Sequence, residues 1–171
     1  MKFGNYCLEE AFNSPDNLVA KFLSTLHDSG VEGLQFDTLV GTGFSGALVV
    51  PTLGRAIHKD YLLVRKPGDS HHHGSAIAEG NYNDSGKWLF VDDGIGTGKT
   101  YTRVRHAVNK LSRQAGLPDE FVGAYLYGHD VLHGAQLWTP DDLSRNGIRP
   151  NYLDRDAREQ IDAYHGDEEL F

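Results

Sequence analysis

The sequence predicts an α/β domain with a central, mostly parallel β-sheet flanked by helices. Short apolar runs at 36–40, 61–64 and 88–91 each end in glycine or polar residues, and a fourth run covers 121–126. Segments with helical spacing of apolar residues lie between them. Continuous apolar strands that alternate with helices are typical of a parallel sheet covered on both faces. In such sheets, ligands bind just beyond the carboxyl ends of the strands.

The composition narrows the class of protein. The 171 residues suit one domain, and 39% hydrophobic residues suffice for a buried core. The sequence contains no apolar run long enough for a membrane span and no secretory signal pattern, so we expect a cytoplasmic protein without a membrane partner. Cys7 is the single cysteine, which excludes an intramolecular disulfide. The net charge of −8 argues against a nucleic-acid partner bound through its phosphates.

The chain is expected to form a single domain, 1–171, built from three parts. Ser14-Pro15-Asp16 predicts a helix start near the N-terminus, with proline at the first helical position. Residues 67–86 are rich in glycine, histidine and serine and predict a long loop, of the kind that often covers an active site. The three parts are an N-terminal helical hood (1–30), a core (about 31–135) and an acidic C-terminal segment (136–171), with a helix expected at 154–164.

The strongest chemical signal follows the strand at 88–91. Two adjacent carboxylates, Asp92 and Asp93, are followed by a glycine-bearing turn that opens a helix. Successive backbone N–H groups at a helix start can surround a phosphate, and the helix dipole favours its negative charge. The Thr97 and Thr100 hydroxyls are available to the same ligand.

Two ligand classes compete for this segment. Gly98-Lys99-Thr100 fits the end of a Walker A loop, but Asp93 stands where that loop needs its first glycine. A carboxylate at that position would repel a triphosphate, and a later Walker B strand is not evident. A P-loop NTPase or kinase therefore remains an alternative.

The segment from 88 to 100 resembles the phosphoribosyl-diphosphate signature of type I phosphoribosyltransferases, as found in the orotate and adenine enzymes. It has an apolar strand, two acids, small residues and the pattern Thr-Gly-x-Thr. The resemblance implies that Asp92 and Asp93 hold the ribose hydroxyls and hold a metal ion indirectly, through ribose or water. It implies a 5-phosphate subsite at Gly96, Thr97, Gly98, Lys99 and Thr100.

Two further segments resemble the same family in the same order, so that the resemblance covers roughly 36–126. Residues 37–54 are similar to the family's pyrophosphate loop, and 61–66 resembles the strand whose terminal Arg-Lys faces the pyrophosphate. The next segment, with the three histidines 71–73, resembles the mobile catalytic loop. The implied pyrophosphate subsite is Thr42, Gly43, Ser45, Gly46, Arg65 and Lys66, and the implied catalytic residues are Asp92, Asp93, Arg65, Lys66, His71 and His73.

The resemblance implies a pentosyltransferase that moves 5-phosphoribose from phosphoribosyl diphosphate to a nucleobase and releases pyrophosphate. Mg²⁺ is the implied cofactor, an orotate-like or purine base the implied acceptor, and a homodimer the implied assembly, in nucleotide biosynthesis or nucleobase salvage. Ser45 stands where adenine-type enzymes usually place arginine, and Asp69 or Ser70 replaces the lysine of the orotate-type loop. These departures keep a second alternative open, a non-catalytic regulator that binds phosphoribosyl diphosphate.

Overall fold

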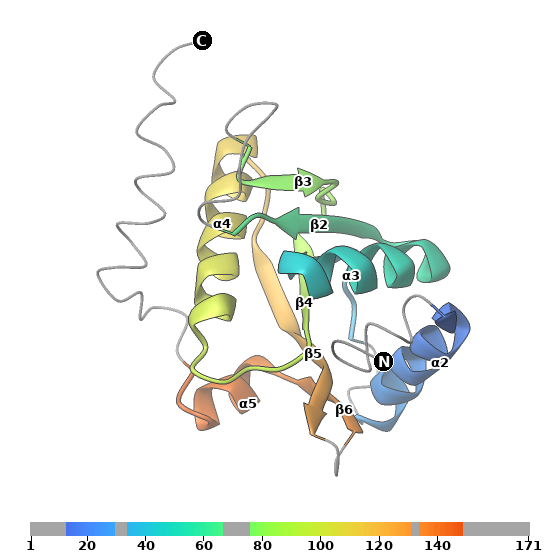
Figure 1. Ribbon diagram of the computed structural model, residues 1–171. Helices are drawn as coiled ribbons and strands as arrows, with labels where there is room; N and C mark the ends of the chain where they lie inside the picture. The colour runs from blue at the N-terminus through green and yellow to red at the C-terminus, as the bar shows by residue number, and fades with distance from the viewer. Residues whose placement is uncertain (1–12, 30–33, 67–75, 131–133, 149–171) are drawn as a thin grey trace.

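A computed structural model describes residues 13–29, 34–66, 76–130 and 134–148, which form one six-stranded sheet with helices on both faces (Figure 1). The strand order is β3-β2-β1-β4-β5-β6. The strands are β1 (Thr38–Thr42), β2 (Asp60–Val64), β3 (Ala78–Gly80), β4 (Lys87–Asp92), β5 (Glu120–Asp130) and β6 (Gly134–Trp138). The four inner strands run parallel, whereas β3 and β6 pair antiparallel with their neighbours. The predicted α/β class with a mostly parallel sheet is confirmed.

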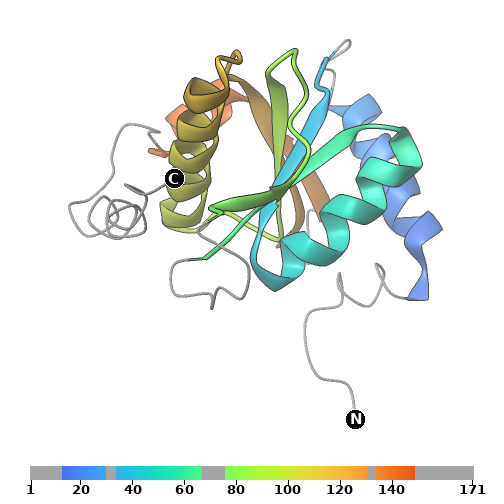
Figure 2. The same cartoon turned by 90° about the horizontal axis from the view of Figure 1, so that it is seen from above.

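The helices cover the sheet from two sides. They are α2 (Pro15–Asp28), α3 (Gly43–Ile57), α4 (Lys99–Ala115) and α5 (Pro140–Arg145). Seen from above in Figure 2, α4 lies on one side of the sheet, and α2 and α3 lie on the other. None of the helices in the described ranges has the length and apolar character that crossing a membrane requires.

Strand β4 shows why the strand runs are continuously apolar. Trp88 and Phe90 belong to the core cluster under α4, whereas Leu89 and Val91 belong to the cluster under α2 and α3. All four side chains are fully buried, since successive residues of a strand point to opposite faces and both faces are covered here.

The glycines that follow the apolar run 36–40 lie in regular structure. Strand β1 continues to Thr42, and α3 begins at the next residue, so the glycines lie inside regular structure. A β-carbon at Gly46 would come within 3.0 Å of the backbone of Gly41, and one at Gly41 would come within 2.6 Å of Val50 Cγ2. The glycines therefore let the first turns of α3 pack directly on the end of β1.

Three elements were not predicted from the sequence. Strand β3 falls inside the stretch 67–86, which was expected to be a loop, and it pairs with β2. Strand β6 crosses the predicted boundary between the core and the acidic C-terminal segment at 136, and helix α5 lies within that segment. The remainder of that region, 149–171, lies outside the described residues, as does the helix predicted at 154–164.

The predicted N-terminal helix is present as α2. Its buried residues Leu18 and Phe22 join the core cluster on the α3 side of the sheet. The ring of Phe22 packs edge-on against Tyr125 of β5, with 4.7 Å between ring centroids. This contact fixes α2 against the sheet; its role as a hood stays a prediction.

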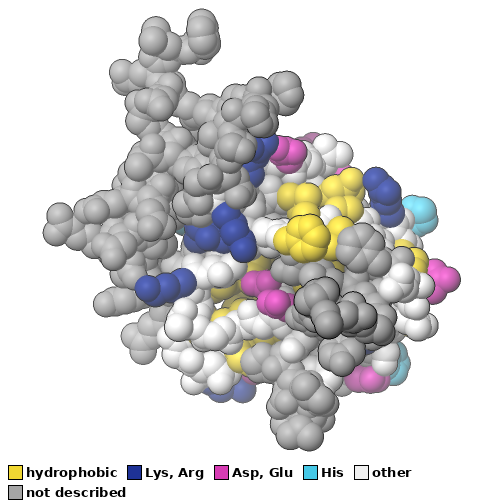
Figure 3. Space-filling model, in the orientation of Figure 1, with side chains coloured by type: hydrophobic (Ala, Val, Ile, Leu, Met, Phe, Trp, Pro, Cys, Tyr) yellow, Lys and Arg dark blue, Asp and Glu magenta, His cyan; other side chains and the backbone are white. Residues whose placement is uncertain are grey.

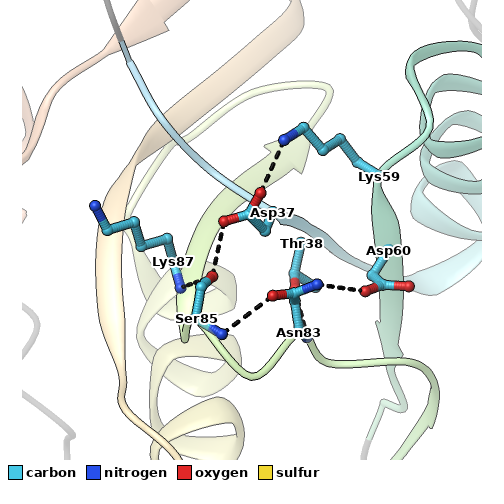
Figure 4. A network of polar contacts seen from close by, with 7 residues as sticks. All are labelled: Asp37, Thr38, Lys59, Asp60, Asn83, Ser85 and Lys87. Atoms are coloured by element: carbon cyan, nitrogen blue, oxygen red, sulfur yellow. Dashed lines mark hydrogen bonds and ion pairs between the residues drawn. The ribbon is translucent and has the colours of Figure 1, made fainter.

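A polar network fastens the amino ends of the strands (Figure 4). The Asp37 carboxylate accepts hydrogen bonds from Lys59 Nζ and Ser85 Oγ, both at 2.8 Å. The side-chain amide of Asn83 donates to Asp60 at 2.9 Å. These bonds join the turn before β4 to β1 and β2, at the opposite end of the sheet from the predicted ligand site.

Candidate functional site

The parallel strands bring the predicted site residues to one edge of the sheet. Strand β1 lies between β2 and β4. Strand β1 ends at Thr42, β2 at Val64 and β4 at Asp92. Because the carboxyl ends of parallel strands share an edge, the turn after β1 and the turn after β4 lie side by side.

Asp92 is the last residue of β4 and is only 7% exposed. Its Oδ1 accepts the backbone N–H of Asp93 at 3.0 Å. Burial, followed by the negative charge of Asp93, raises the pKa of Asp92 to about 7, while the positive charge of Lys66 acts in the opposite direction. Asp92 is thus a carboxyl group that changes protonation near neutral pH.

The turn after Asp93 leads to the open amino end of α4. Gly98, with a φ of +77°, precedes the helix and has no side chain that could cap it, and the first turn of the helix contains no acidic residue. A β-carbon at Gly96 would meet nothing within 4 Å, so space is open above the turn. The N–H groups in the first turn of a helix favour an anion. The structure brings together here the predicted 5-phosphate residues Gly96, Thr97, Gly98, Lys99 and Thr100.

Helix α5 supports this turn from behind, which the sequence analysis missed. A β-carbon at Gly98 would come within 2.9 Å of Ile148 Cγ2. Ile148 is buried, and its N–H donates to the Leu143 carbonyl at 2.9 Å after the left-handed residue Gly147. The signal for α5 was present in Thr139-Pro140-Asp141-Asp142, which forms a capping box with proline at the first turn.

The start of α3 has a lysine side chain directly over it. Gly43 has a φ of +66°, and its missing β-carbon would lie 2.5 Å from Lys66 Cε and 2.7 Å from Lys66 Nζ. Lys66 also acts on the pKa of Asp92. The ammonium group therefore lies over the start of α3, whose first turn contains no acidic residue.

Thr42 precedes α3 but does not cap it with its side chain. The Thr42 hydroxyl donates instead to the Val64 carbonyl at 2.7 Å, and the residue is 3% exposed. The hydroxyl has a single proton, and the bond to Val64 takes it. A contact from Thr42 to an anion would have to come from its backbone.

The structure separates the predicted pair Arg65 and Lys66. The guanidinium of Arg65 forms an ion pair with Glu79 on β3, whereas Lys66 covers Gly43. A cleft of about 330 Å³ lies over these side chains and is lined by Gly43, Phe44, Ala47, Leu63, Val64, Arg65, Lys66 and Glu79. Phe44 is 69% exposed at its rim. On the face shown in Figure 3, hydrophobic side chains gather over β2 and α3, and acidic side chains lie near them.

Some predicted site residues lie outside the described part of the chain. These are His71 and His73 and the side chain of Ser45. Gly46 is described, and it packs against the backbone of Gly41.

Arg103 is a site residue that the sequence analysis did not single out. It projects from the second turn of α4, and its Nη2 donates to the Thr42 hydroxyl at 3.3 Å. An arginine on an amphipathic helix gives no sequence signal that would distinguish it from a solvated surface residue.

The carboxylates of Asp92 and Asp93 fit a magnesium ion bound mainly by oxygens of its ligand. Within the described ranges, no three or more histidine, cysteine or acidic side chains are grouped so as to hold a metal by themselves. Mg²⁺ usually takes one or two carboxylates and completes its shell with water and substrate phosphates. The adjacent pair supplies that number of hard oxygen donors.

Comparisons with known proteins find likeness in structure but not in sequence. The sequence matches neither a protein-family model nor a curated protein. Among solved structures, adenine phosphoribosyltransferase from Saccharomyces cerevisiae is 26% identical, with a TM-score of 0.45 over 64% of each chain. Orotate phosphoribosyltransferase from Aeropyrum pernix is 17% identical, with a TM-score of 0.49 over 78% of this chain and 67% of that one. Orotate phosphoribosyltransferase from Francisella tularensis is 15% identical, with a TM-score of 0.47 over 90% of this chain and 80% of that one.

The chain spans only part of several similar structures. It covers 21% of the Leishmania donovani UMP synthase and 56% of the Mycobacterium tuberculosis orotate phosphoribosyltransferase.

Proposed function

We propose that this protein binds phosphoribosyl diphosphate at the carboxyl edge of its sheet and transfers 5-phosphoribose to a nucleobase, with release of pyrophosphate. The observation that carries the proposal is the position of Asp92 and Asp93 between two open helix starts. The carboxylates stand at the end of β4, α4 opens directly after them, and Lys66 lies across from them over the start of α3.

Each part of the proposed ligand has a chemically matched partner. Neighbouring ribose hydroxyls donate hydrogen bonds, which suits the adjacent carboxylates of Asp92 and Asp93. A dianionic phosphate suits the uncapped start of α4, beside the exposed residues Thr97 and Lys99. A diphosphate suits the start of α3, where the ammonium of Lys66 stands over Gly43.

The reaction would place its largest change in charge on the departing pyrophosphate. Lys66 and the N–H groups of the first turn of α3 would stabilise that charge, because they are already in position before it develops. Arg65 would join them only after release from Glu79. Mg²⁺ held by Asp92 and Asp93 through ribose or water would supply further neutralisation of the diphosphate charge.

The acceptor is proposed to be an orotate-like or purine base, and the assembly a homodimer. The choice of base rests on the Arg65-Lys66 pair and the loop histidines, and the homodimer rests on the family resemblance as a whole. His71 and His73 are proposed as catalytic residues on the same ground.

A panel of bases tests the function. Orotate, uracil, adenine, guanine, hypoxanthine and nicotinamide are each incubated with the protein, phosphoribosyl diphosphate and Mg²⁺, and pyrophosphate release is measured. We expect release with one base. The double variant Asp92→Asn with Asp93→Asn should lose binding of phosphoribosyl diphosphate, whereas Asp84→Asn, in an exposed turn, should keep it. Binding without release for any base would favour the regulator, and unchanged affinity in the double variant would contradict the site.

A further inference from the structure

Arg103 connects the two turns of the candidate site from inside the protein. It belongs to α4, which begins at the turn after β4, and it donates to the hydroxyl of Thr42, which ends β1. Thr42 in turn donates to the carbonyl of Val64, the last residue of β2. The chain of hydrogen bonds therefore runs through the ends of three elements that each carry part of the site.

The direction of this chain is fixed by the chemistry of its groups. A guanidinium can only donate, and a carbonyl oxygen can only accept. The Thr42 hydroxyl, with one proton and two lone pairs, must accept from Arg103 and donate to Val64. Thr42 is 3% exposed, so water has little access to replace either bond.

The arrangement has a consequence for a ligand that reaches both turns. Phosphate at the start of α4 and diphosphate at the start of α3 are parts of one molecule, so the distance between the turns must match that molecule. A ligand that occupies one turn alone does not depend on this distance. A residue that holds the turns in register should therefore affect the affinity for the whole ligand more than the affinity for either of its parts alone.

We infer that Arg103 is a positioning residue, which holds the Thr42 turn in register with the amino end of α4 through the Thr42 hydroxyl. This inference rests on the proposed function, because the register is needed by a ligand with two phosphate groups. Arg103 acts through Thr42 and is not proposed to touch the ligand.

The ligand experiment compares the wild-type protein with Arg103→Met, which keeps most of the side-chain stem. Arg113→Met, an exposed arginine in the last turn of the same helix, controls for the loss of one positive charge. Calorimetry with Mg²⁺ measures affinity for pyrophosphate, ribose 5-phosphate and phosphoribosyl diphosphate. We expect Arg103→Met to lower the affinity for phosphoribosyl diphosphate about tenfold. The affinity for pyrophosphate and for ribose 5-phosphate should each fall by less than about twofold. If pyrophosphate binding weakens as much, Arg103 acts as an anion-binding charge and the inference is wrong.

A double-mutant cycle without ligand tests whether Arg103 acts through Thr42. The unfolding equilibrium constant is measured by denaturant titration for Arg103→Met, Thr42→Val and the double variant. Each single variant raises the unfolding equilibrium constant by some factor. If the two residues are coupled, the factor for the double variant should be at least about threefold smaller than the product of the two single factors. Effects that simply multiply would overturn the inference, even if all ligands bind. A wild-type protein that binds none of the three ligands would overturn the proposed function, and the register role with it.

Discussion

The ammonium nitrogen of Lys66 lies 2.7 Å from the point where a β-carbon on residue 43 would stand. Glycine is required at this position for two reasons, since Gly43 also has a φ of +66°. A cation above a helix start is opposed by the helix dipole, so an anion placed between them would be attracted by both. The contact therefore marks the place where the diphosphate is proposed to bind.

Gly43→Ala is expected to weaken pyrophosphate binding as well as stability. The left-handed backbone should cost about 1–2 kcal/mol of unfolding free energy, and the new methyl group must also displace the end of Lys66. Gly116→Ala is the matched control, because its φ is +68° but its β-carbon would meet nothing within 4 Å. Denaturant titration should show a similar loss of stability in both variants, and calorimetry a loss of pyrophosphate affinity in Gly43→Ala alone. Equal affinities in the two variants would argue against a role for the Lys66 contact in binding.

Asp92→Asn is expected to stabilise the protein at alkaline pH. The folded-state pKa of Asp92 is raised to about 7, against an unfolded value of about 3.9. Between these values the folded state binds more protons than the unfolded state, so wild-type stability falls as pH rises through this window. The asparagine variant does not lose this contribution, so its advantage in unfolding free energy should be small near pH 4 and largest above pH 8.

Thermal or chemical unfolding at pH 5 and pH 8 checks this pH dependence, with Asp84→Asn as the exposed control. The same Asp92→Asn variant should bind phosphoribosyl diphosphate poorly, so that stability and ligand affinity change in opposite directions. If Asp92→Asn is less stable than wild type at pH 8, ionisation of the buried Asp92 carboxyl group does not destabilise the folded protein.

Ile148→Ala is expected to loosen the turn that leads into α4. Removing this buried side chain should cost about 2–3 kcal/mol of unfolding free energy and should weaken ribose 5-phosphate binding severalfold. Val108→Ala, in the same core cluster but on the third turn of α4, should lose stability while keeping affinity. Calorimetry and denaturant titration on the two variants separate the effects. Retained affinity in Ile148→Ala would mean that α5 supports the fold but not the turn.

Lys99→Ala distinguishes the proposed function from a P-loop protein. Lys99 is exposed at the start of α4, so its loss should weaken phosphoribosyl diphosphate binding only about two- to fivefold, as expected for a solvated charge. We expect no measurable ATP binding by either protein. ATP binding by the wild type that disappears in Lys99→Ala would favour the NTPase or kinase alternative.

The sequence predicted the inner strands and the order of the site motifs because each rests on a local pattern. Apolar runs such as 88–91 and the acid pair after them can be recognised without knowledge of their neighbours. The edge strands were missed for the opposite reason. Strand β3 is three residues long and mostly exposed, so its pairing with β2 gives almost no hydrophobic signal of its own.

The contacts that complete the site are long-range and could not be predicted. The contact between Lys66 and Gly43, the bond from Arg103 to Thr42 and the packing of Ile148 on Gly98 each join residues distant in the sequence. The ion pair between Arg65 and Glu79 could not be predicted either, because it depends on the pairing of β2 with β3. Helix α5 is different, because its capping box could have been recognised from Thr139 and Asp142.

The polar network around Asp37 and Asn83 lies at the opposite end of the strands from the edge where the ligand is proposed to bind. Lys59 and Ser85 fasten the strands at the end farthest from Asp92 and Lys66. Substitutions at the ligand edge can then alter recognition while strand alignment is maintained from the other end. A scaffold divided in this way gives an engineer, or natural selection, freedom to exchange one phosphorylated ligand for another without redesigning the fold.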